Sequence, residues 1–437
     1  MNKSLKIIII SIGIVLILGA VGLLFIYKNK DGDSGIDIIK NTLPFGSNPN
    51  NSSATNTDNT NTGDTETSSG WIGDISKPKL FQIHKEAVAG SYSFKDEDDT
   101  VARYMERGVG HIFETNMSTL NEERISNTTR LKIYEALWGN SGKNVVIRYL
   151  DDTDEETIRS FAITLKDTTN SSTLFEEEIP TETQSQETEG VFLPENITSM
   201  ALSEEDDKKI FYLFKIDDSS VGTIYNLESG KMAQIFQSQF TEWLPQWPNK
   251  DIITLTTKPS EKVPGFMYFL NTKTEELVKI LSDIKGLTTL TSPNVENILY
   301  SESANGWVSL NIYNTKKHSS STLPLATLPE KCVWSKSDKN IIYCAVPKNP
   351  QRGSYPDQWY QGLISFSDDI WSINTETYAT ERILSLSDAA REEFDVIKPQ
   401  ISDNGEFIFF TNKKDLSLWG IKLSTKDTNT MDDLLID

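Results

Sequence analysis

One short turn recurs seven times along this chain, and this repetition constrains the fold more than any other sequence feature. Each copy follows an anchor residue, usually apolar, and leads into a β-rich run, as in WPNKDIITL, WSKSDKNIIYC and ISDNGEFIFFT. Successive anchors are 44, 64, 45, 44, 43 and 67 residues apart, so the two long separations contain one period plus an insertion. The anchors are Phe94, Trp138, Leu202, Trp247, Thr291, Trp334 and Ile401.

A second landmark keeps the same period. Alternating aromatic or aliphatic residues run into a polar turn at IYNLESG, YFLNTKT, NIYNTKK and WSINTET. Such alternation is typical of a strand that packs one face against a neighbouring sheet. Each period therefore predicts four strands, and a four-stranded period of about 40–50 residues is the sequence signature of a β-propeller. The shared position is Asn226, Asn271, Asn314 and Asn374, with Lys422 in the last copy.

We therefore expect an all-β fold, a seven-bladed β-propeller. A β-sandwich also has short strands and frequent turns, but it does not repeat one turn and one aromatic–Asn landmark over five periods. The last blade lacks an obvious fourth strand after its third, at residues 416–423. Residues 79–83 end eleven residues before Phe94, which is the spacing of an outer strand in three other periods. We expect this segment to complete the last blade and close the ring.

The blade sequence ISDNGEFIFFTNKKDLSLWGIKL resembles those of TolB-type and WD40-like propellers, which also precede the hydrolase domain of prolyl-oligopeptidase-type enzymes. The segments KCVWS…IYCAVP and YPDQWYQG…DDIW are similar to membrane-anchored propellers of small-genome bacteria. The resemblance covers about residues 79–425. It implies the propeller fold and no particular activity. The Trp-Asp signature of WD40 repeats does not occur here.

The N-terminal region predicts a membrane anchor. Residues 7–27, between Lys6 and Lys28, carry no charge, and 21 such residues are long enough for a helix to span a bilayer. A cleavable signal peptide is the alternative, but its apolar region is usually only about 7–15 residues long. We expect residues 1–30 to be a cytoplasmic tail and anchor, and the Asn/Thr/Ser-rich residues 31–77 to be a disordered tether. Residues 78–437 would then form a propeller outside the cytoplasm, on a single-pass membrane protein.

Charge excludes one class of partner and leaves little sign of bound ions. The chain has a net charge of −21 and no Lys/Arg-rich run, so we expect it not to bind nucleic acid. The acidic runs at 95–99, 151–156 and 204–207 match no calcium-binding loop, and we interpret them as solvated turns. An acidic insertion at about residues 167–195 should form a loose loop. We expect no metal and no cofactor. The three histidines, His84, His111 and His318, fall in different blades or turns.

Two cysteines, Cys332 and Cys344, flank a predicted hairpin turn at residues 335–339. In that hairpin they face each other across adjacent antiparallel strands, where opposed Cα atoms lie about 4.5 Å apart, at the lower edge of disulfide geometry. Outside the cytoplasm the pair should form a disulfide. In a reducing compartment it would remain two buried thiols, and a zinc site would need further ligands.

The best candidate binding site is a loop of the sixth blade. Between the predicted second strand, residues 340–346, and third strand, residues 363–373, lies the segment PKNPQRGSYPDQWYQG. Such loops share one propeller face with the connections between blades, and ligands usually dock on that face. Rigid aromatic residues are enriched at interaction hot spots. Alternatively, the loop folds back into the channel or buries its own aromatic side chains. The candidate residues are Tyr355, Asp357, Trp359 and Tyr360.

Two classes of function follow. The first is a non-catalytic binding or scaffold module that recognises a protein, peptide or glycan at the cell surface. The second is a hydrolase-type propeller enzyme, or the regulatory propeller of a membrane protease or signalling complex. The sequence contains no G-x-S-x-G, P-loop or H-E-x-x-H motif. We expect the first class and no catalytic residues, although one fold hosts many functions.

Overall fold

The computed structural model describes residues 79–126, 128–151, 157–166 and 188–423. All of them belong to the compact unit Thr67–Asp437. The predicted anchor at residues 7–27 and tether at residues 31–77 lie outside the described residues. Within the described ranges, no helix has both the length and the apolar character needed to cross a membrane.

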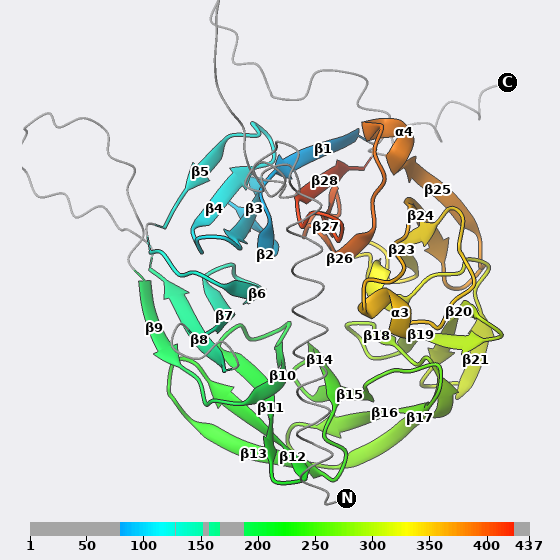
Figure 1. Ribbon diagram of the computed structural model, residues 1–437, viewed down its shortest axis with the longest axis horizontal. Helices are drawn as coiled ribbons and strands as arrows, with labels where there is room; N and C mark the ends of the chain where they lie inside the picture. Colours follow the sequence, from blue (N-terminus) through cyan, green and yellow to red (C-terminus); the bar gives the residue numbers. More distant parts are fainter. Residues whose placement is uncertain (1–78, 127, 152–156, 167–187, 424–437) are drawn as a thin grey trace, which may run out of the picture. The chain divides into compact units, whose positions relative to one another are not determined.

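The described strands form seven four-stranded antiparallel sheets around a common axis (Figure 1). In each blade the first strand lies nearest the axis and the fourth lies on the rim. This arrangement confirms the predicted all-β, seven-bladed β-propeller. The first three blades contain β2 (Val88–Asp96), β3 (Asp99–Glu106), β4 (Ile112–Asn116) and β5 (Glu122–Arg124); β6 (Ile133–Trp138), β7 (Asn144–Leu150), β8 (Ile158–Leu165) and β9 (Thr188–Phe192); and β10 (Ile197–Leu202), β11 (Lys209–Ile216), β12 (Ser219–Asn226) and β13 (Met232–Ser238).

The remaining blades repeat this plan, with three short helices between strands. They contain β14 (Trp243–Asn249), β15 (Ile252–Thr257), β16 (Pro264–Asn271) and β17 (Leu277–Lys285); β18 (Thr289–Thr291), β19 (Asn297–Ala304), β20 (Trp307–Asn314) and β21 (Ser319–Thr322); β22 (Cys332–Trp334), β23 (Ile341–Pro347), β24 (Asp368–Asn374) and β25 (Thr380–Ser385); and β26 (Val396–Ile401), β27 (Phe407–Asn412), β28 (Leu418–Lys422) and β1 (Lys79–His84). The helices are η1 (Pro329–Lys331), α3 (Asp357–Tyr360) and α4 (Leu386–Ala390).

The ring closes as predicted, because β1 supplies the fourth strand of the seventh blade. Lys79 pairs with Lys422 and Phe81 pairs with Gly420 in the antiparallel register of β1 and β28. The Phe81 ring covers Gly420, where an added Cβ would lie 2.4 Å from the ring. One sheet therefore joins segments from opposite ends of the described chain and leaves β28 without a free edge.

Two predicted segment boundaries need correction. The third strand of blade 6 begins at Asp368 and not at residue 363, because the residues before it pack within the preceding loop, where Phe366 is buried. The end of the acidic insertion is also ordered. Residues 188–192 form β9, which pairs with β8 as the fourth strand of blade 2, and Leu193 is buried.

The shared Asn of the sequence repeat ends the third strand and organises the turn that follows it. The Oδ1 atom of Asn271 accepts the backbone N–H groups of Lys273 and Thr274, both at 2.9 Å. The N–H of Glu275, which has a positive φ of 60°, donates to the backbone carbonyl of Asn271. Asn side chains favour such turns because they replace one backbone acceptor. The same side-chain contact occurs at Asn116, Asn226, Asn314 and Asn374.

The predicted disulfide joins Cys332 of β22 to Cys344 of β23. The two residues are directly opposed in the antiparallel register, and their Cα atoms are 4.0 Å apart. The hairpin register and the pairing that follows from it are therefore confirmed. The disulfide lies in the apolar core between blades 5 and 6.

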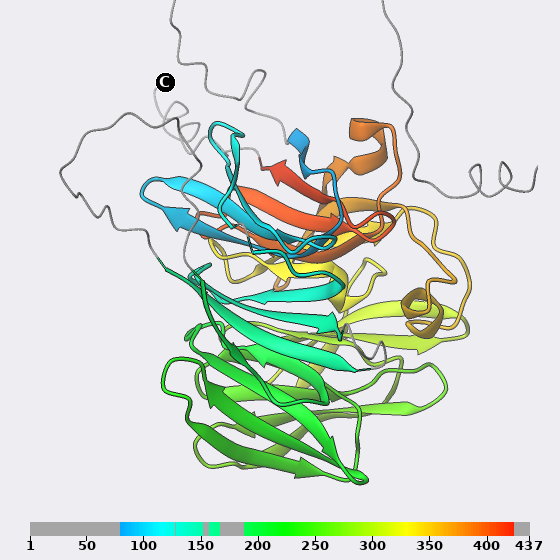
Figure 2. The same cartoon turned by 60° about the vertical axis from the view of Figure 1, so that its left-hand side comes forward.

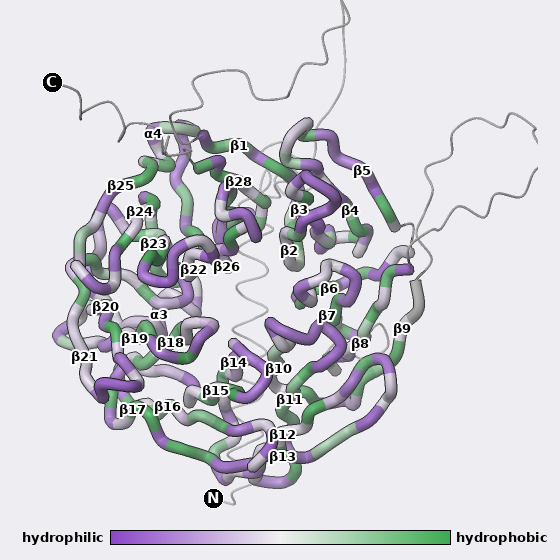
Figure 3. The backbone as a smooth tube through the Cα atoms, turned by 180° about the vertical axis from the view of Figure 1, so that it is seen from behind, coloured by the Kyte–Doolittle hydropathy of each residue, from purple (hydrophilic) through white to green (hydrophobic). Residues whose placement is uncertain are grey.

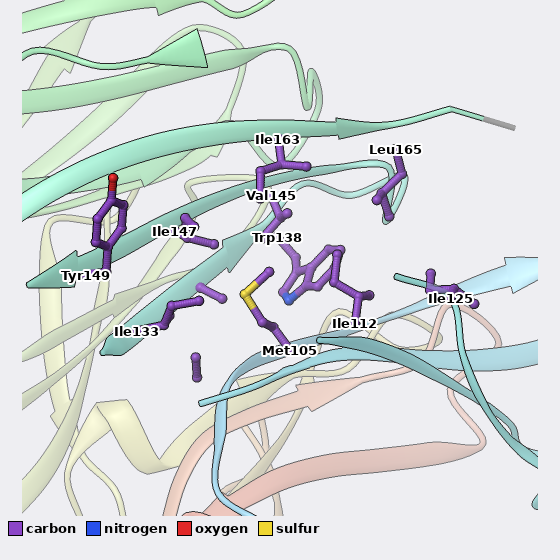
Figure 4. Packing of buried hydrophobic residues seen from close by; sticks show 12 residues of the cluster. Met105, Ile112, Ile125, Ile133, Trp138, Val145, Ile147, Tyr149, Ile163 and Leu165 are labelled. Carbon is purple, nitrogen blue, oxygen red and sulfur yellow. The ribbon is translucent and has the colours of Figure 1, made fainter. Parts of the chain in front are cut away.

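Hydrophobic layers between neighbouring blades hold the ring together. Between blades 1 and 2, Trp138 packs beside Met105 and Ile112, and its Nε1 donates to the Gly90 carbonyl at 3.2 Å (Figure 4). Gly90 permits this close approach, since a Cβ there would lie 1.9 Å from the Ala136 carbonyl oxygen. In Figure 3, hydrophobic stretches follow the strands, and many turns are hydrophilic.

Candidate functional site

The loop between β23 and β24 buries two of its four predicted binding residues. Tyr355 is 1% exposed and Trp359 is 3% exposed. Their rings lie 5.8 and 6.1 Å from the Phe366 ring and form a small apolar cluster with Leu328. These aromatic side chains therefore hold the loop in place. This matches the alternative raised from the sequence, in which the loop buries its own aromatic side chains. Figure 2 shows α3, within this loop, outside the blade sheets.

Asp357 fixes the loop to a different blade. Its Oδ2 accepts the backbone N–H of Glu261 at 2.8 Å, and Ser354 donates a hydrogen bond to the Glu261 carboxylate. Ser303, at the end of β19, donates to the Tyr355 carbonyl at 2.7 Å. The blade 6 loop thus crosses blade 5 and reaches blade 4, so its position is determined by three blades.

Tyr360, the fourth predicted residue, remains 39% exposed and lines a cavity of about 570 Å³. The cavity walls come mainly from the starts of β10, β14 and β18, the strands nearest the axis, and from Glu330 in η1 (Figure 1). Because these segments begin the inner strands, the cavity lies at one end of the central channel. This is the face on which the sequence predicted ligand binding.

A fixed wall of the cavity connects blades 4 and 5. The Gln246 side chain donates to the Thr289 carbonyl at 2.6 Å and accepts the Thr291 N–H at 3.1 Å. The hydroxyl groups of Thr256 and Thr289 are 2.7 Å apart. These groups satisfy one another and are not free to bind a ligand. On the rim, Lys258 and Glu242 form an exposed ion pair at 2.7 Å.

Glu330 is the unusual charged group of the cavity. Protein atoms surround its carboxylate, although part of the side chain remains open to solvent. The partial loss of water around the carboxylate raises the pKa of Glu330 to about 7. The Tyr360 hydroxyl donates to this carboxylate, and together with the positive charges of Lys331 and Lys413 it opposes that rise. Burial and the nearby Glu330 charge raise the pKa of Tyr360, so the phenol remains a proton donor.

The histidines lie in separate environments, none of which lines the cavity. His84 Nδ1 contacts the Glu122 carboxylate at 2.6 Å on the outer strands of neighbouring blades. His111 contacts Thr129 and His318 contacts Tyr313, both at 3.2 Å. Among the described residues, no group of three or more His, Cys, Asp or Glu side chains is arranged to hold a metal ion.

Sequence reasoning missed Glu330 and the inner-strand residues beside it. Glu330 lies two residues before the start of β22, so its place in the repeat is on the predicted binding face. The repeat therefore contained a signal for its general position. The convergence of Glu330 with residues of β10, β14 and β18 depends on ring geometry, which a single period does not specify.

Comparisons with known proteins extend to the fold alone. No known family and no curated protein matches the chain in sequence. Similar solved structures include oligogalacturonate lyase from Vibrio parahaemolyticus, with 11% identity, a TM-score of 0.48 and coverage of 79% of this chain and 98% of that one. A puromycin-hydrolysing peptidase of Mycobacterium tuberculosis has 9% identity, a TM-score of 0.47 and coverage of 75% and 52%. TolB from Acinetobacter baumannii has 8% identity, a TM-score of 0.40 and coverage of 70% and 63%.

Proposed function

We propose that this propeller is a binding module whose channel mouth accepts a basic side chain of a protein or peptide partner. The observation that carries the proposal is the position of Glu330, a carboxylate inside the 570 Å³ cavity beside the exposed ring of Tyr360. A carboxylate next to an aromatic ring is suited to a Lys ammonium or an Arg guanidinium, through charge-assisted hydrogen bonds and cation–π contact.

Size and charge support this assignment. A cavity of this volume falls in the range of small-ligand sites, so it fits a side chain or short peptide segment and not a folded domain. The chain carries a net charge of −21, which favours the approach of a basic partner. A cationic group bound at Glu330 would also stabilise the ionised carboxylate, so binding should strengthen as the pH rises through about 7.

We further propose that the module is displayed outside the cytoplasm, anchored by residues 7–27 and extended by the tether at residues 31–77. The uncharged 21-residue run supports the anchor. The Cys332–Cys344 disulfide supports an oxidising location. The partner would then lie at the cell surface. The carboxylate in the cavity favours a protein or peptide with a basic side chain over a glycan.

One observation favours the alternative, an enzyme. A Glu with a pKa near 7 beside a Tyr proton donor is suited to general acid–base catalysis. The cavity lining contains no His or Cys and no side chain in the arrangement of an activated nucleophile. Binding therefore remains the better account of these residues.

The decisive experiment is titration of the full-length protein with a tri-lysine peptide, followed by its fully acetylated form. We expect acetylation and Glu330→Gln each to weaken binding by about tenfold or more, because a charge-assisted hydrogen bond contributes roughly 1.5–3 kcal/mol. The matched control is Glu393→Gln, whose exposed carboxylate pairs with Lys414 and lies outside the cavity. Equal affinity for both peptides, or unchanged binding by Glu330→Gln, would reject the proposal.

A further inference from the structure

A fully buried lysine sits between two fully buried carboxylates, away from solvent. Lys331 is 0% exposed, and its Nζ lies 2.7 Å from Asp395 Oδ1 and 2.8 Å from Asp368 Oδ2. The same nitrogen donates to the Val396 carbonyl at 2.7 Å. Aromatic rings enclose the cluster, since the centroids of Trp359 and Phe366 are each 5.1 Å from Nζ.

The charges in this cluster do not balance if both carboxyl groups are ionised. Asp368 Oδ1 is buried without a hydrogen-bond partner. Burial, with a contribution from the Asp395 charge, raises the pKa of Asp368 to about 6. Asp368 can therefore hold a proton within reach of the Lys331 nitrogen.

Asp395 has a different environment from Asp368. Its Oδ2 accepts three hydrogen bonds: from Trp359 Nε1 at 3.0 Å, from the Phe366 N–H at 3.1 Å and from Ser365 Oγ at 3.2 Å. Convergent donors on one carboxyl oxygen polarise the carbonyl group and stabilise the negative charge that develops there during nucleophilic attack. The other oxygen, Oδ1, accepts from the Lys331 Nζ at 2.7 Å and shares the Trp359 donor at 3.1 Å.

We propose that Lys331 and Asp395 form an intramolecular amide crosslink, with Asp368 as the proton carrier. A proton first moves from the Lys331 ammonium to the Asp395 carboxylate, giving a neutral amine and a carboxylic acid. The amine attacks Asp395 Cγ, the negative charge develops on Oδ2 among its three donors, and the C–Oδ1 bond breaks. Two protons from the original ammonium leave with Oδ1 as water, and no oxidant, reductant or other reactant is needed.

The buried setting supports each step of this reaction. The 0% exposure of Lys331 and Asp395 excludes water from the site and so protects the amide from hydrolysis. Fixed contact between the amine and the carboxyl group replaces an encounter in solution, and such proximity accelerates well-oriented intramolecular reactions. Asp368 contacts the Lys331 nitrogen. It can therefore take a proton from the attacking amine and return it to the leaving Oδ1 of Asp395.

Peptide mapping of the full-length protein, after reduction and denaturation, tests the proposal. We expect a branched peptide that joins the Lys331 and Asp395 segments, with a mass one water below the sum of the two, and no tryptic cleavage after Lys331. Recovery of both linear peptides in full yield, even after prolonged incubation, would overturn the proposal. A linear Asp395 peptide that has lost water by cyclisation would overturn it as well. The exposed Lys336–Asp403 ion pair is the internal control and should yield linear peptides.

Two variants assign the roles. Asp395→Asn should give the same branched peptide but release ammonia in place of water. Asp368→Asn should slow crosslinking by about a hundredfold, the order of a general acid–base contribution, while circular dichroism shows an unchanged fold. A branch that joins Lys331 to residue 368 would overturn the assignment of Asp395. Crosslinking of folded Asp368→Asn at the wild-type rate would overturn the proton-carrier role.

Discussion

Lys79 pairs with Lys422 across β1 and β28, so the seventh blade is completed by the first described strand of the chain. This pairing removes the exposed edge that the blade would otherwise present, and it places Ile83 in a buried cluster with Val88 and Phe409. The stability of the ring should therefore depend on residues that precede the first repeat.

Substitution of Ile83 by Ala tests this dependence. Ile83 is 9% exposed, and its truncation should lower the free energy of unfolding by about 2–4 kcal/mol, as a cavity-forming change in a core. Ile216→Ala at a 48% exposed position is the matched control and should change it by less than about 0.5 kcal/mol. Denaturant titration measures both. Equal effects of the two variants would contradict a role for β1 in closing the ring.

The contact between Gly90 and Ala136 predicts a second effect on stability. A Cβ on Gly90 would lie 1.9 Å from the Ala136 carbonyl, so Gly90→Ala must move blades 1 and 2 apart or shift a strand. We expect a loss of about 1–3 kcal/mol in unfolding free energy, typical of overpacking. Gly108 has no atom within 4 Å of an added Cβ, so Gly108→Ala is the control. Thermal unfolding of both variants measures the loss, and equal stability of Gly90→Ala and Gly108→Ala would contradict the prediction.

The disulfide predicts the behaviour of the two thiols. Cys332 and Cys344 should resist alkylation in denatured protein until a reductant is added. Replacement of both by Ser should lower stability by roughly 2–3 kcal/mol, as expected for a short closed loop. Labelling in intact cells also tests the proposed location. Free thiols in freshly denatured protein would argue for a reducing compartment and against display outside the cytoplasm.

The pKa of Glu330 predicts a pH-dependent cost in stability. Its rise from 4.5 to about 7 means that the folded protein binds this proton more tightly than the unfolded chain does. The free energy of unfolding should therefore fall as the pH rises between these two values. At pH about 8, Glu330→Gln should be more stable than the wild type by about 2 kcal/mol, a figure reduced for the solvent that reaches the group, and at pH about 4 the two should agree.

The matched control for this prediction is again Glu393→Gln. A hydrogen bond from Lys414 lowers the pKa of Glu393, the opposite direction from Glu330, so this exposed carboxylate gives no reason for a gain in stability at high pH. Denaturant titration at several pH values measures both variants. A Glu330→Gln variant that is no more stable than the wild type at high pH would show that the cavity solvates the carboxylate well.

The sequence predicted the architecture because each repeated feature has a local cause. The shared Asn marks the turn after the third strand, since its side chain accepts backbone N–H groups two and three residues ahead. The spacing of residues 79–83 before Phe94 was sufficient to place β1 in the last blade, because every blade has the same strand order.

The candidate site was less accessible to such reasoning. The sequence identified an aromatic loop, but nothing in it distinguishes Trp359, which packs inside the loop, from Tyr360, which faces the cavity. Their environments depend on Phe366 and Glu330, which approach through tertiary contacts. Glu330 itself becomes unusual only when the ring brings the inner strands of several blades around it. The binding role of Tyr355, Asp357, Trp359 and Tyr360 stays a prediction, most direct for Tyr360.

The pairing of β1 with β28 has a consequence for biosynthesis. The ribosome makes β1 before any blade exists, yet its partner strand emerges only after all the other blades have been translated. Until then β1 has no sheet to join, and the ring stays open. A chain that stops early leaves unpaired strand edges, which are preferred substrates for proteases and templates for aggregation. Closure of the last blade thus makes synthesis through β28 a condition for a stable product.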